Sequence, residues 1–148
     1  MDIMMRGSML MLALLLALPA AADEVPIGFV KTVAGEASVM SAGKKVKAEV
    51  GTPLFEGSTL RTGAKSSMGV TFKDETVMSL GPDTELTVDE YLYAPAKGKL
   101  KLGSKMTRGS VNYVSGVIAK LQPDAVTVGT PTGTIGVRGT QFLLLVEE

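Results

Sequence analysis

The stretch SMGVTFKDETVMSLGPDTELTVD, residues 67–89, decides the fold class of this chain. Over residues 68–72, apolar side chains occupy every second position, and the same alternation returns twice further along the stretch. The repeats are separated by Asp74 and Glu75 and by Gly81-Pro82-Asp83, which are turn signals. Period-two alternation puts one side of an extended segment in a core and the other in water. The stretch therefore predicts a meander of short strands.

The glycine spacing extends this pattern along most of the chain. Of the 17 glycines, all but Gly7 lie beyond residue 22, and short Val/Thr/Leu stretches separate them. Turn signals spaced in this way are typical of many short strands. The only segment compatible with a helix, of about one turn, is near Ser115 to Leu121. The sequence thus predicts a single compact all-β domain, a β-sandwich or roll of meandering hairpins, with a short β-solenoid-like stack as the alternative.

The N-terminus has the pattern of a secretory signal peptide. Arg6 precedes an apolar run, Met9–Leu18, and a small-residue trio, Ala20–Ala22, follows it. The run is shorter than the roughly 20 residues that a membrane-spanning helix needs. We therefore expect residues 1–22 to be removed, leaving residues 23–148 as one domain, periplasmic or secreted, with no membrane span after cleavage.

The composition excludes several kinds of chemistry. The chain has neither cysteine nor histidine, which rules out disulfides, thiolate or imidazole metal sites and Ser-His or Cys-His catalytic pairs. It has 15 basic and 15 acidic residues, hence no net charge, and no tryptophan. A general electrostatic attraction to nucleic acid is therefore not indicated. We expect no metal, no cofactor and no nucleic-acid partner.

Two motifs that suggest catalysis are better explained as turns. Ser41-Ala42-Gly43-Lys44 matches the S-x-x-K of serine penicillin-interacting enzymes, but its companion motifs occur in the wrong order and Gly43 suggests a hairpin tip. The acidic residues lack calcium-loop spacing, so we interpret them as solvated turn residues. A pair of distant carboxylates acting as in a glycosidase stays open as the alternative. These acidic residues are Asp74, Glu75, Asp83, Glu85, Asp89 and Glu90.

Two further segments allow a structural and a functional interpretation. The lysines between Lys97 and Lys105 are interpreted as the wet face of a strand, and contact with an anionic partner is the alternative. Phe142–Val146 is an uninterrupted apolar run, which is typical of a strand buried on both faces. The alternative for this run is an edge strand that pairs with a partner chain.

The order of the motifs resembles the FecR domain over residues 28–146. Its most specific part is the closing run TPTGTIGVRGTQF, residues 130–142. Two positions depart from the family pattern: Ser58 stands where aspartate is frequent, and Glu75 stands where glycine usually follows Asp74. The earlier motifs of the set are residues 35–39, 51–57, 60–63, 66–74, 80–86 and 115–120.

This resemblance implies a role in the bacterial cell envelope. In iron-uptake signalling, proteins with this domain carry a cytoplasmic segment that controls a sigma factor and a membrane helix. A cleavable signal and one domain would not transmit a signal to the cytoplasm, so we expect a non-catalytic binding or sensing-accessory module. Its expected partner is an envelope or outer-membrane protein. The alternatives are a carboxylate-based envelope hydrolase and a self-associating secreted surface protein, and the oligomeric state stays open.

The closing motif supplies the candidate site residues, with either a structural or a partner-contact role. Arg138 is expected to lie against the body of the domain, where its planar guanidinium can tie several acceptors together. On that interpretation, Arg138→Ala is strongly destabilising. Backbone N–H groups beside Arg138 offer a small anion nest as the functional alternative. The other candidates are Thr130, Gly136, Gly139 and Thr140.

Overall fold

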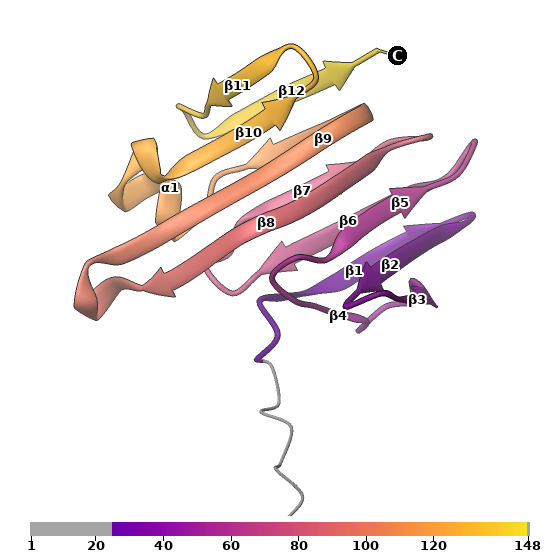
Figure 1. Ribbon diagram of the computed structural model, residues 1–148, viewed down its shortest axis with the longest axis horizontal. Helices are drawn as coiled ribbons and strands as arrows, with labels where there is room; N and C mark the ends of the chain where they lie inside the picture. The colour runs from indigo at the N-terminus through magenta and orange to yellow at the C-terminus, as the bar shows by residue number, and fades with distance from the viewer. Residues whose placement is uncertain (1–24, 148) are drawn as a thin grey trace, which may run out of the picture.

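The computed structural model describes residues 25–147, which form one all-β domain whose sheet curls around a single core (Figure 1). The expected signal peptide and its cleavage point after Ala22 lie outside these described residues. Among residues 25–147, no helix is long and apolar enough to cross a membrane. The predicted all-β fold with many short strands is therefore confirmed.

Within residues 25–147, twelve strands make up the sheet. Three short helical segments interrupt them: η1 (Pro95–Lys97), α1 (Val117–Leu121) and η2 (Pro123–Ala125). The helix α1 lies in the one segment that the sequence left compatible with a helix. The strands are β1 (Gly28–Ala34), β2 (Ala37–Ser41), β3 (Lys44–Lys47), β4 (Pro53–Leu54), β5 (Thr59–Thr62), β6 (Ser67–Phe72), β7 (Val77–Leu80), β8 (Glu85–Ala94), β9 (Lys99–Val114), β10 (Val126–Thr130), β11 (Gly133–Gly136) and β12 (Gln141–Val146).

The long strand β9 joins two halves of the curled sheet. Its first part pairs with β8 and β10, and its last part pairs with β7 and β12. We call the half with β3, β2, β5, β8, β10 and β11 the front sheet, and the half with β4, β1, β6, β7 and β12 the back sheet. Only β10 and β9 pair in parallel among the described strands. This antiparallel arrangement is a sandwich-like roll and not a solenoid stack.

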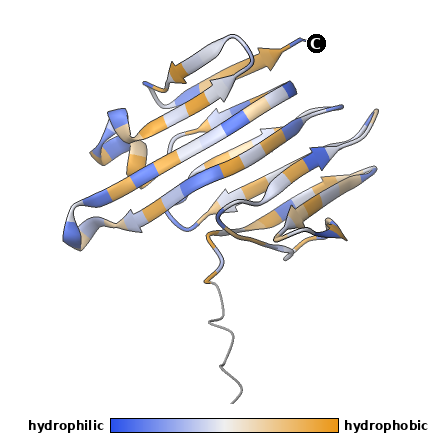
Figure 2. Cartoon of the chain, in the orientation of Figure 1, coloured by the Kyte–Doolittle hydropathy of each residue, from blue (hydrophilic) through white to orange (hydrophobic). Residues whose placement is uncertain are grey.

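The predicted alternation builds the core between the two sheets. In β6, Met68, Val70 and Phe72 are buried, and β7 buries Met78 and Leu80 on the same side. Hydrophobic and hydrophilic residues alternate in the same way along β8 and β9 (Figure 2). The meander predicted for residues 67–89 is therefore confirmed as β6, β7 and the start of β8.

Hairpin tips lie where the turn signals predicted them. The S-x-x-K match falls on the turn between β2 and β3, where Ala42 (φ 51°) and Gly43 (φ 79°) have left-handed backbone conformations. Such a two-residue turn matches the twist of a hairpin. The serine and lysine of this motif are thus the strand ends on either side of a hairpin tip, as the sequence indicated, and the Ser41 hydroxyl pairs with that of Ser58.

Asp74 was expected to be a solvated turn residue, but it is fully buried. Its Oδ2 accepts hydrogen bonds from Thr76 Oγ1 (2.7 Å) and from the backbone N–H of Ile118 (3.0 Å). Its Oδ1 accepts one from Tyr91 Oη (2.9 Å). Ile118 lies in the first turn of α1, so a carboxylate 44 residues earlier in the chain caps this helix. Sequence spacing gave no sign of this, because the cap comes from another element.

The C-terminal strand is also not the fully buried strand that its composition favoured. In β12, Phe142, Leu144 and Val146 are partly buried against the core, while Leu143 and Leu145 are exposed. The ring of Phe142 stacks on Tyr113 of β9, with a centroid distance of 4.9 Å. β12 pairs with β9 along one of its edges, so it is the last strand of the back sheet. Only one of its two faces packs on the core. An apolar run alone does not reveal which face meets a neighbouring layer.

Candidate binding face

The outward side chains of the front sheet form a row of charges across five strands. The register places Ser38 of β2 between Lys47 of β3 and Arg61 of β5. The row continues through Glu85 of β8 to Arg108 of β9. Directly opposed side chains on one face lie within contact distance of their neighbours. Residues that are far apart in the sequence therefore make one continuous surface.

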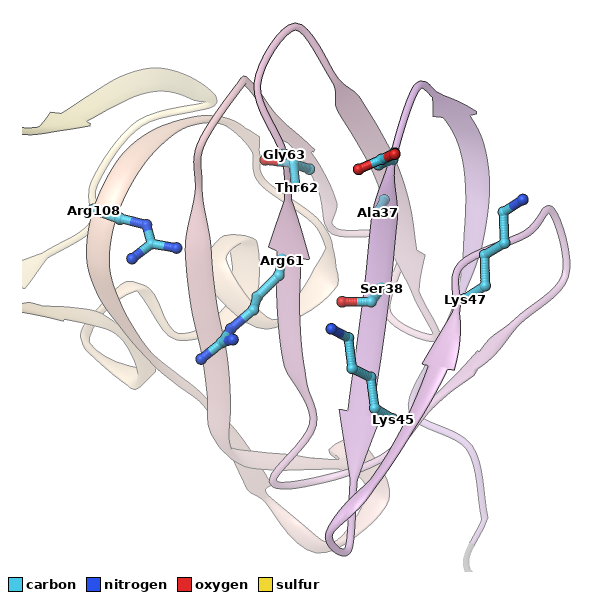
Figure 3. A pocket seen from close by; sticks show the side chains of 9 residues that line it. Ala37, Ser38, Lys45, Lys47, Arg61, Thr62, Gly63 and Arg108 are labelled. Atoms are coloured by element: carbon cyan, nitrogen blue, oxygen red, sulfur yellow. The ribbon is translucent and has the colours of Figure 1, made fainter.

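This row borders a shallow hollow of about 490 Å³ on the outside of the sheet. Glu36, Lys45 and the strand end at Thr62 and Gly63 complete its lining. Figure 3 shows Lys45 extending toward Ser38, whereas Arg61 extends across the sheet toward β8. The hollow is open to solvent and has no deep cleft, so it suits contact with a surface or an extended ligand.

Glu85 organises the basic side chains around it. Its Oε2 lies 2.9 Å from Arg61 Nε and 3.9 Å from Arg108 Nη2. The hollow and the row together contain four cations, Lys45, Lys47, Arg61 and Arg108, against the two carboxylates of Glu36 and Glu85. The patch therefore has an excess of positive charge in a chain that is neutral as a whole. Its chemistry is that of a face for carboxylates, phosphates or sulfates.

The lysines after η1 extend the basic character of the same sheet. Lys99 and Lys105 are exposed on the front sheet, and Lys101 Nζ lies 3.9 Å from Glu90 Oε2. Lys97 is exposed in η1. Their interpretation as the wet face of a strand is thus confirmed for the three residues in β9.

Within residues 25–147, no three acidic side chains are grouped so that they can hold a metal ion. Asp74 is enclosed by its donors, and Glu85 is held between two guanidinium groups. Asp74 therefore has no open approach for a substrate, and Glu85, which is partly exposed, is engaged by two cations.

The residues predicted from the closing motif do not come together in one site. Thr130 lies at the β10–β11 turn, where its hydroxyl donates to the carbonyl of Gly133 (2.9 Å). Gly139 and Thr140 lie at the other end of that hairpin and bind Ser115. The Ser115 hydroxyl donates to Gly139 O (2.7 Å), and the Ser115 N–H donates to Thr140 O (2.9 Å). These residues shape two turns on either side of the hairpin.

The remaining two candidates are exposed. Gly136 ends β11, and its surroundings leave room for a side chain. Arg138 is not against the body of the domain, because its side chain is 81% exposed and pairs with Asp124 (3.1 Å). Val137 is the buried residue here, and its N–H donates to Val126 O. The apolar neighbour takes the inward direction, which turns the guanidinium outward.

Arg138→Ala is therefore expected to change the free energy of unfolding by less than about 1 kcal/mol, the usual range for an exposed ion pair. Urea unfolding followed by circular dichroism measures this change. Asp124→Ala is the matched control, since it removes the same pair from the other side and should have a similarly small effect. A loss of several kcal/mol for Arg138→Ala only would instead indicate a structural anchor.

The basic row is the functional feature that the sequence analysis missed. Lys45 and Lys47 alternate with Val46 in β3, and this alternation is the only local signal. Arg61 and Arg108 lie in segments that are far apart in the sequence, and no local pattern connects them. Their common surface depends on strand order, which sequence periodicity does not determine.

Comparison with known proteins assigns this chain to a sequence family. The sequence model described as FecR protein matches residues 58–148, which is more than half of the chain. The chain belongs to the FecR family. This family is a signalling-related domain family of the cell envelope. No curated protein and no solved structure matches the chain.

The FecR match begins 30 residues later than the resemblance drawn from the motifs. It includes β5 to β12, and β1 to β4 precede it. Arg61 and Arg108 of the basic row thus lie inside the matched region, whereas Lys45 and Lys47 lie before it. The matched part supplies most of the core residues, and the strands that come first add Val30, Val39 and Leu54 to the core and complete the hollow.

Several FecR motif residues have structural partners inside the domain. Thr84 Oγ1 donates to Gly81 O and accepts from the N–H of Ser110 (3.0 Å), which ties the β7–β8 turn to β9. Ser58, which departs from the family pattern, is buried and accepts from the N–H of Phe55. Glu75 has φ 72°, a conformation that favours the glycine common at this place. Both departures therefore concern turns and leave the fold unchanged.

Proposed function

We propose that this FecR-family chain is an exported, non-catalytic binding module of the bacterial cell envelope. Its basic row on the front sheet binds an acidic surface of an envelope or outer-membrane protein. The observation that carries this proposal is the registered row of Lys47, Arg61 and Arg108 around Glu85.

The dimensions of the row favour a protein partner over a single small anion. Neighbouring strands lie about 4.8 Å apart, so five strands in register span about 19 Å along the sheet. Charges spread over this distance match a complementary charged patch and steer its approach. The open shape of the hollow also leaves its cations accessible to side chains that arrive from outside.

The site chemistry favours binding over the hydrolase alternative. A general acid or base must reach the reacting group of the substrate within hydrogen-bond distance. Glu85 is engaged by Arg61 and Arg108, and Asp74 is enclosed, so both carboxylates serve the structure around them. The row is thus better suited to recognising charge than to transferring a proton.

Photo-crosslinking in the native envelope tests the proposal. A photoreactive residue at Ser38, in the middle of the row, should give defined protein adducts. We expect Lys45→Glu combined with Lys47→Glu to reduce these adducts by about tenfold or more, because like charges then face the partner. The urea midpoint should stay close to that of the wild type, since both lysines are exposed.

The matched control reverses two exposed lysines away from the row, Lys73 and Lys120. This double variant should keep the adducts at Ser38. Equal adduct yields from the row variant and the control would reject the basic row as the binding face. Adducts that form only with a photoreactive residue at Ser79, on the outer face of the back sheet, would place binding there instead.

A further inference from the structure

The free edge of β12 is an unprotected strand edge. β12 pairs with β9 through six consecutive positions, from Gln141 opposite Val114 to Val146 opposite Gly109. Within residues 25–147, no strand pairs with its other edge. An edge of this kind presents backbone donors and acceptors to which another strand can add.

The other edges of the sheet carry the usual protection against such pairing. The edge strand β3 contains three lysines in four residues. The edge strand β4 has two residues and begins with Pro53, which has no N–H to donate. β11 is four residues long and has glycine at both ends. By contrast, β12 is six residues long and contains no lysine, proline or glycine.

The backbone of β12 is oriented for pairing on its free side. The N–H of Ser115 donates to Thr140 O, so position 140 points its carbonyl toward β9. Backbone groups alternate in direction along an antiparallel strand. The N–H and C=O groups of Leu143 and Leu145 therefore point away from β9, toward the free edge.

The outer face beside this edge is uncharged. Leu143 is 72% exposed and Leu145 64%, and β12 is hydrophobic along nearly its whole length (Figure 2). The register continues this face across β9, β7, β6 and β1 without a charged side chain at any paired position. The three rows are Phe29, Thr71, Val77, Val114 and Gln141; Thr32, Gly69, Ser79, Asn112 and Leu143; and Ala34, Ser67, Ser110 and Leu145.

We infer that β12 pairs antiparallel with β12 of a second copy of this chain, about a two-fold axis at Leu144. The sequence QFLLLVE, residues 141–147, is self-complementary about this centre. Leu143 of one copy then lies opposite Leu145 of the other, and Gln141 lies opposite Glu147. No two charges of the same sign are opposed, and each copy buries an exposed leucine pair beside its partner.

This dimer leaves the basic row accessible. The row lies on the outer face of the front sheet, whereas β12 ends the back sheet. The pairing would join the two back sheets into one continuous sheet whose outer face has no charged side chain at any paired position; Lys31, in the bulge of the far strand β1, is exposed. Each dimer thus presents two separate basic faces, so the interface and the proposed binding function can be tested independently.

The oligomeric state of the exported protein tests the interface. Sedimentation velocity over a range of concentrations should show a dimer for the wild type. Leu143→Lys combined with Leu145→Lys should weaken dimerisation by at least about tenfold, because lysines of the two copies then face each other. The corresponding double glutamate variant should behave in the same way, and an equimolar mixture of the two variants should form a heterodimer.

A third variant tests the register. When Leu143→Lys and Leu145→Glu are combined in one chain, the register about Leu144 places each lysine opposite a glutamate, and the dimer should persist. A register shifted by one position on each strand would oppose lysine to lysine or, in the other direction, glutamate to glutamate at its centre, and should weaken the dimer. Leu92→Lys, at an exposed leucine of β8 on the front sheet, is the matched control and should leave the dimer intact.

Three results would overturn the inference. One is a wild-type protein that stays monomeric at every concentration tested, which would leave the edge free or reserve it for a different partner. Another is a dimer that the double lysine variant does not weaken, which would place the interface on another surface. A lysine–glutamate mixture that fails to associate, with both variants folded by circular dichroism, would equally contradict the pairing.

Discussion

Asp74→Ala is expected to lower the free energy of unfolding by about 4 kcal/mol, a large fraction of the 5–15 kcal/mol that a typical domain has. The loss follows from the donors that the carboxylate serves inside the protein. Without it, the N–H of Ile118 and the hydroxyl of Thr76 keep no acceptor that replaces Oδ2. Each buried donor left unsatisfied costs about 1–3 kcal/mol. Urea unfolding measures the change.

Tyr91 also depends on the carboxylate of Asp74, which accepts its hydrogen bond. Its hydroxyl donates to Oδ1, and burial, together with the nearby carboxylate, raises the pKa of Tyr91 above its ordinary value. The phenol therefore remains protonated and continues to donate at any pH at which the fold is ordinarily studied. The ring also stacks on Phe72, with a centroid distance of 5.5 Å. The network thus joins β6, β8 and α1.

Asp74→Asn separates shape from charge. An amide keeps the volume of the carboxyl group but turns one acceptor into a donor, and donors already face both oxygens of Asp74. This variant should therefore also be destabilised, by somewhat less than the alanine variant. Asp83→Asn, in an exposed turn with φ 50°, is the matched control and should be nearly neutral. Equal stabilities for the variants at both positions would contradict this account of the buried carboxylate.

Gly116→Ala is the other change with a large expected effect. A Cβ at this position would clash with backbone atoms of the β6–β7 turn, namely Thr76 N, Asp74 O and Glu75 C. Backbone atoms cannot move aside as a flexible side chain can, so α1 would have to separate from the turn. That movement breaks the hydrogen bond from the N–H of Val117 to Asp74 O (2.7 Å) as well as the cap of α1. We expect a loss of about 3 kcal/mol or more.

Gly136→Ala is the control for this prediction. Among residues 25–147, and apart from its two chain neighbours, Gly136 has no heavy atom within 4 Å of the position that a Cβ would take, so alanine should fit there. The thermal midpoint of this variant should stay close to that of the wild type, whereas that of Gly116→Ala should fall or the protein should fail to accumulate. Similar midpoints for both variants would show that α1 can separate from the turn at little cost.

Residues 67–89 illustrate how far local pattern determines this fold. Period-two alternation and turn signals located β6, β7 and the start of β8, because a strand at a core boundary must bury every second side chain. The hairpin tip at Gly43 was predicted on similar local grounds, and the short helix α1 formed in the only segment that the pattern left compatible with a helix. The motif order also indicated the FecR family, which the family match confirms.

Local pattern did not predict the surroundings of the candidate site residues, because these depend on contacts between distant segments. The exposure of Arg138 depends on Val137 taking the inward direction, and the burial of Asp74 depends on α1 closing over its turn. The run Phe142–Val146 was interpreted as fully buried because composition does not show whether a second layer covers a strand. Only one face of it is covered here.

The sequence by itself determined the all-β class, the positions of β6, β7 and the start of β8 with their turns, and the family, since these depend on local periodicity and on motif order. The tertiary structure decided which charges share a surface. Lys47, Arg61 and Arg108 meet only because β3, β2, β5, β8 and β9 pair in that order and register. It also decided that β12 ends a sheet, since an edge is defined by the missing neighbour and not by the residues of the strand.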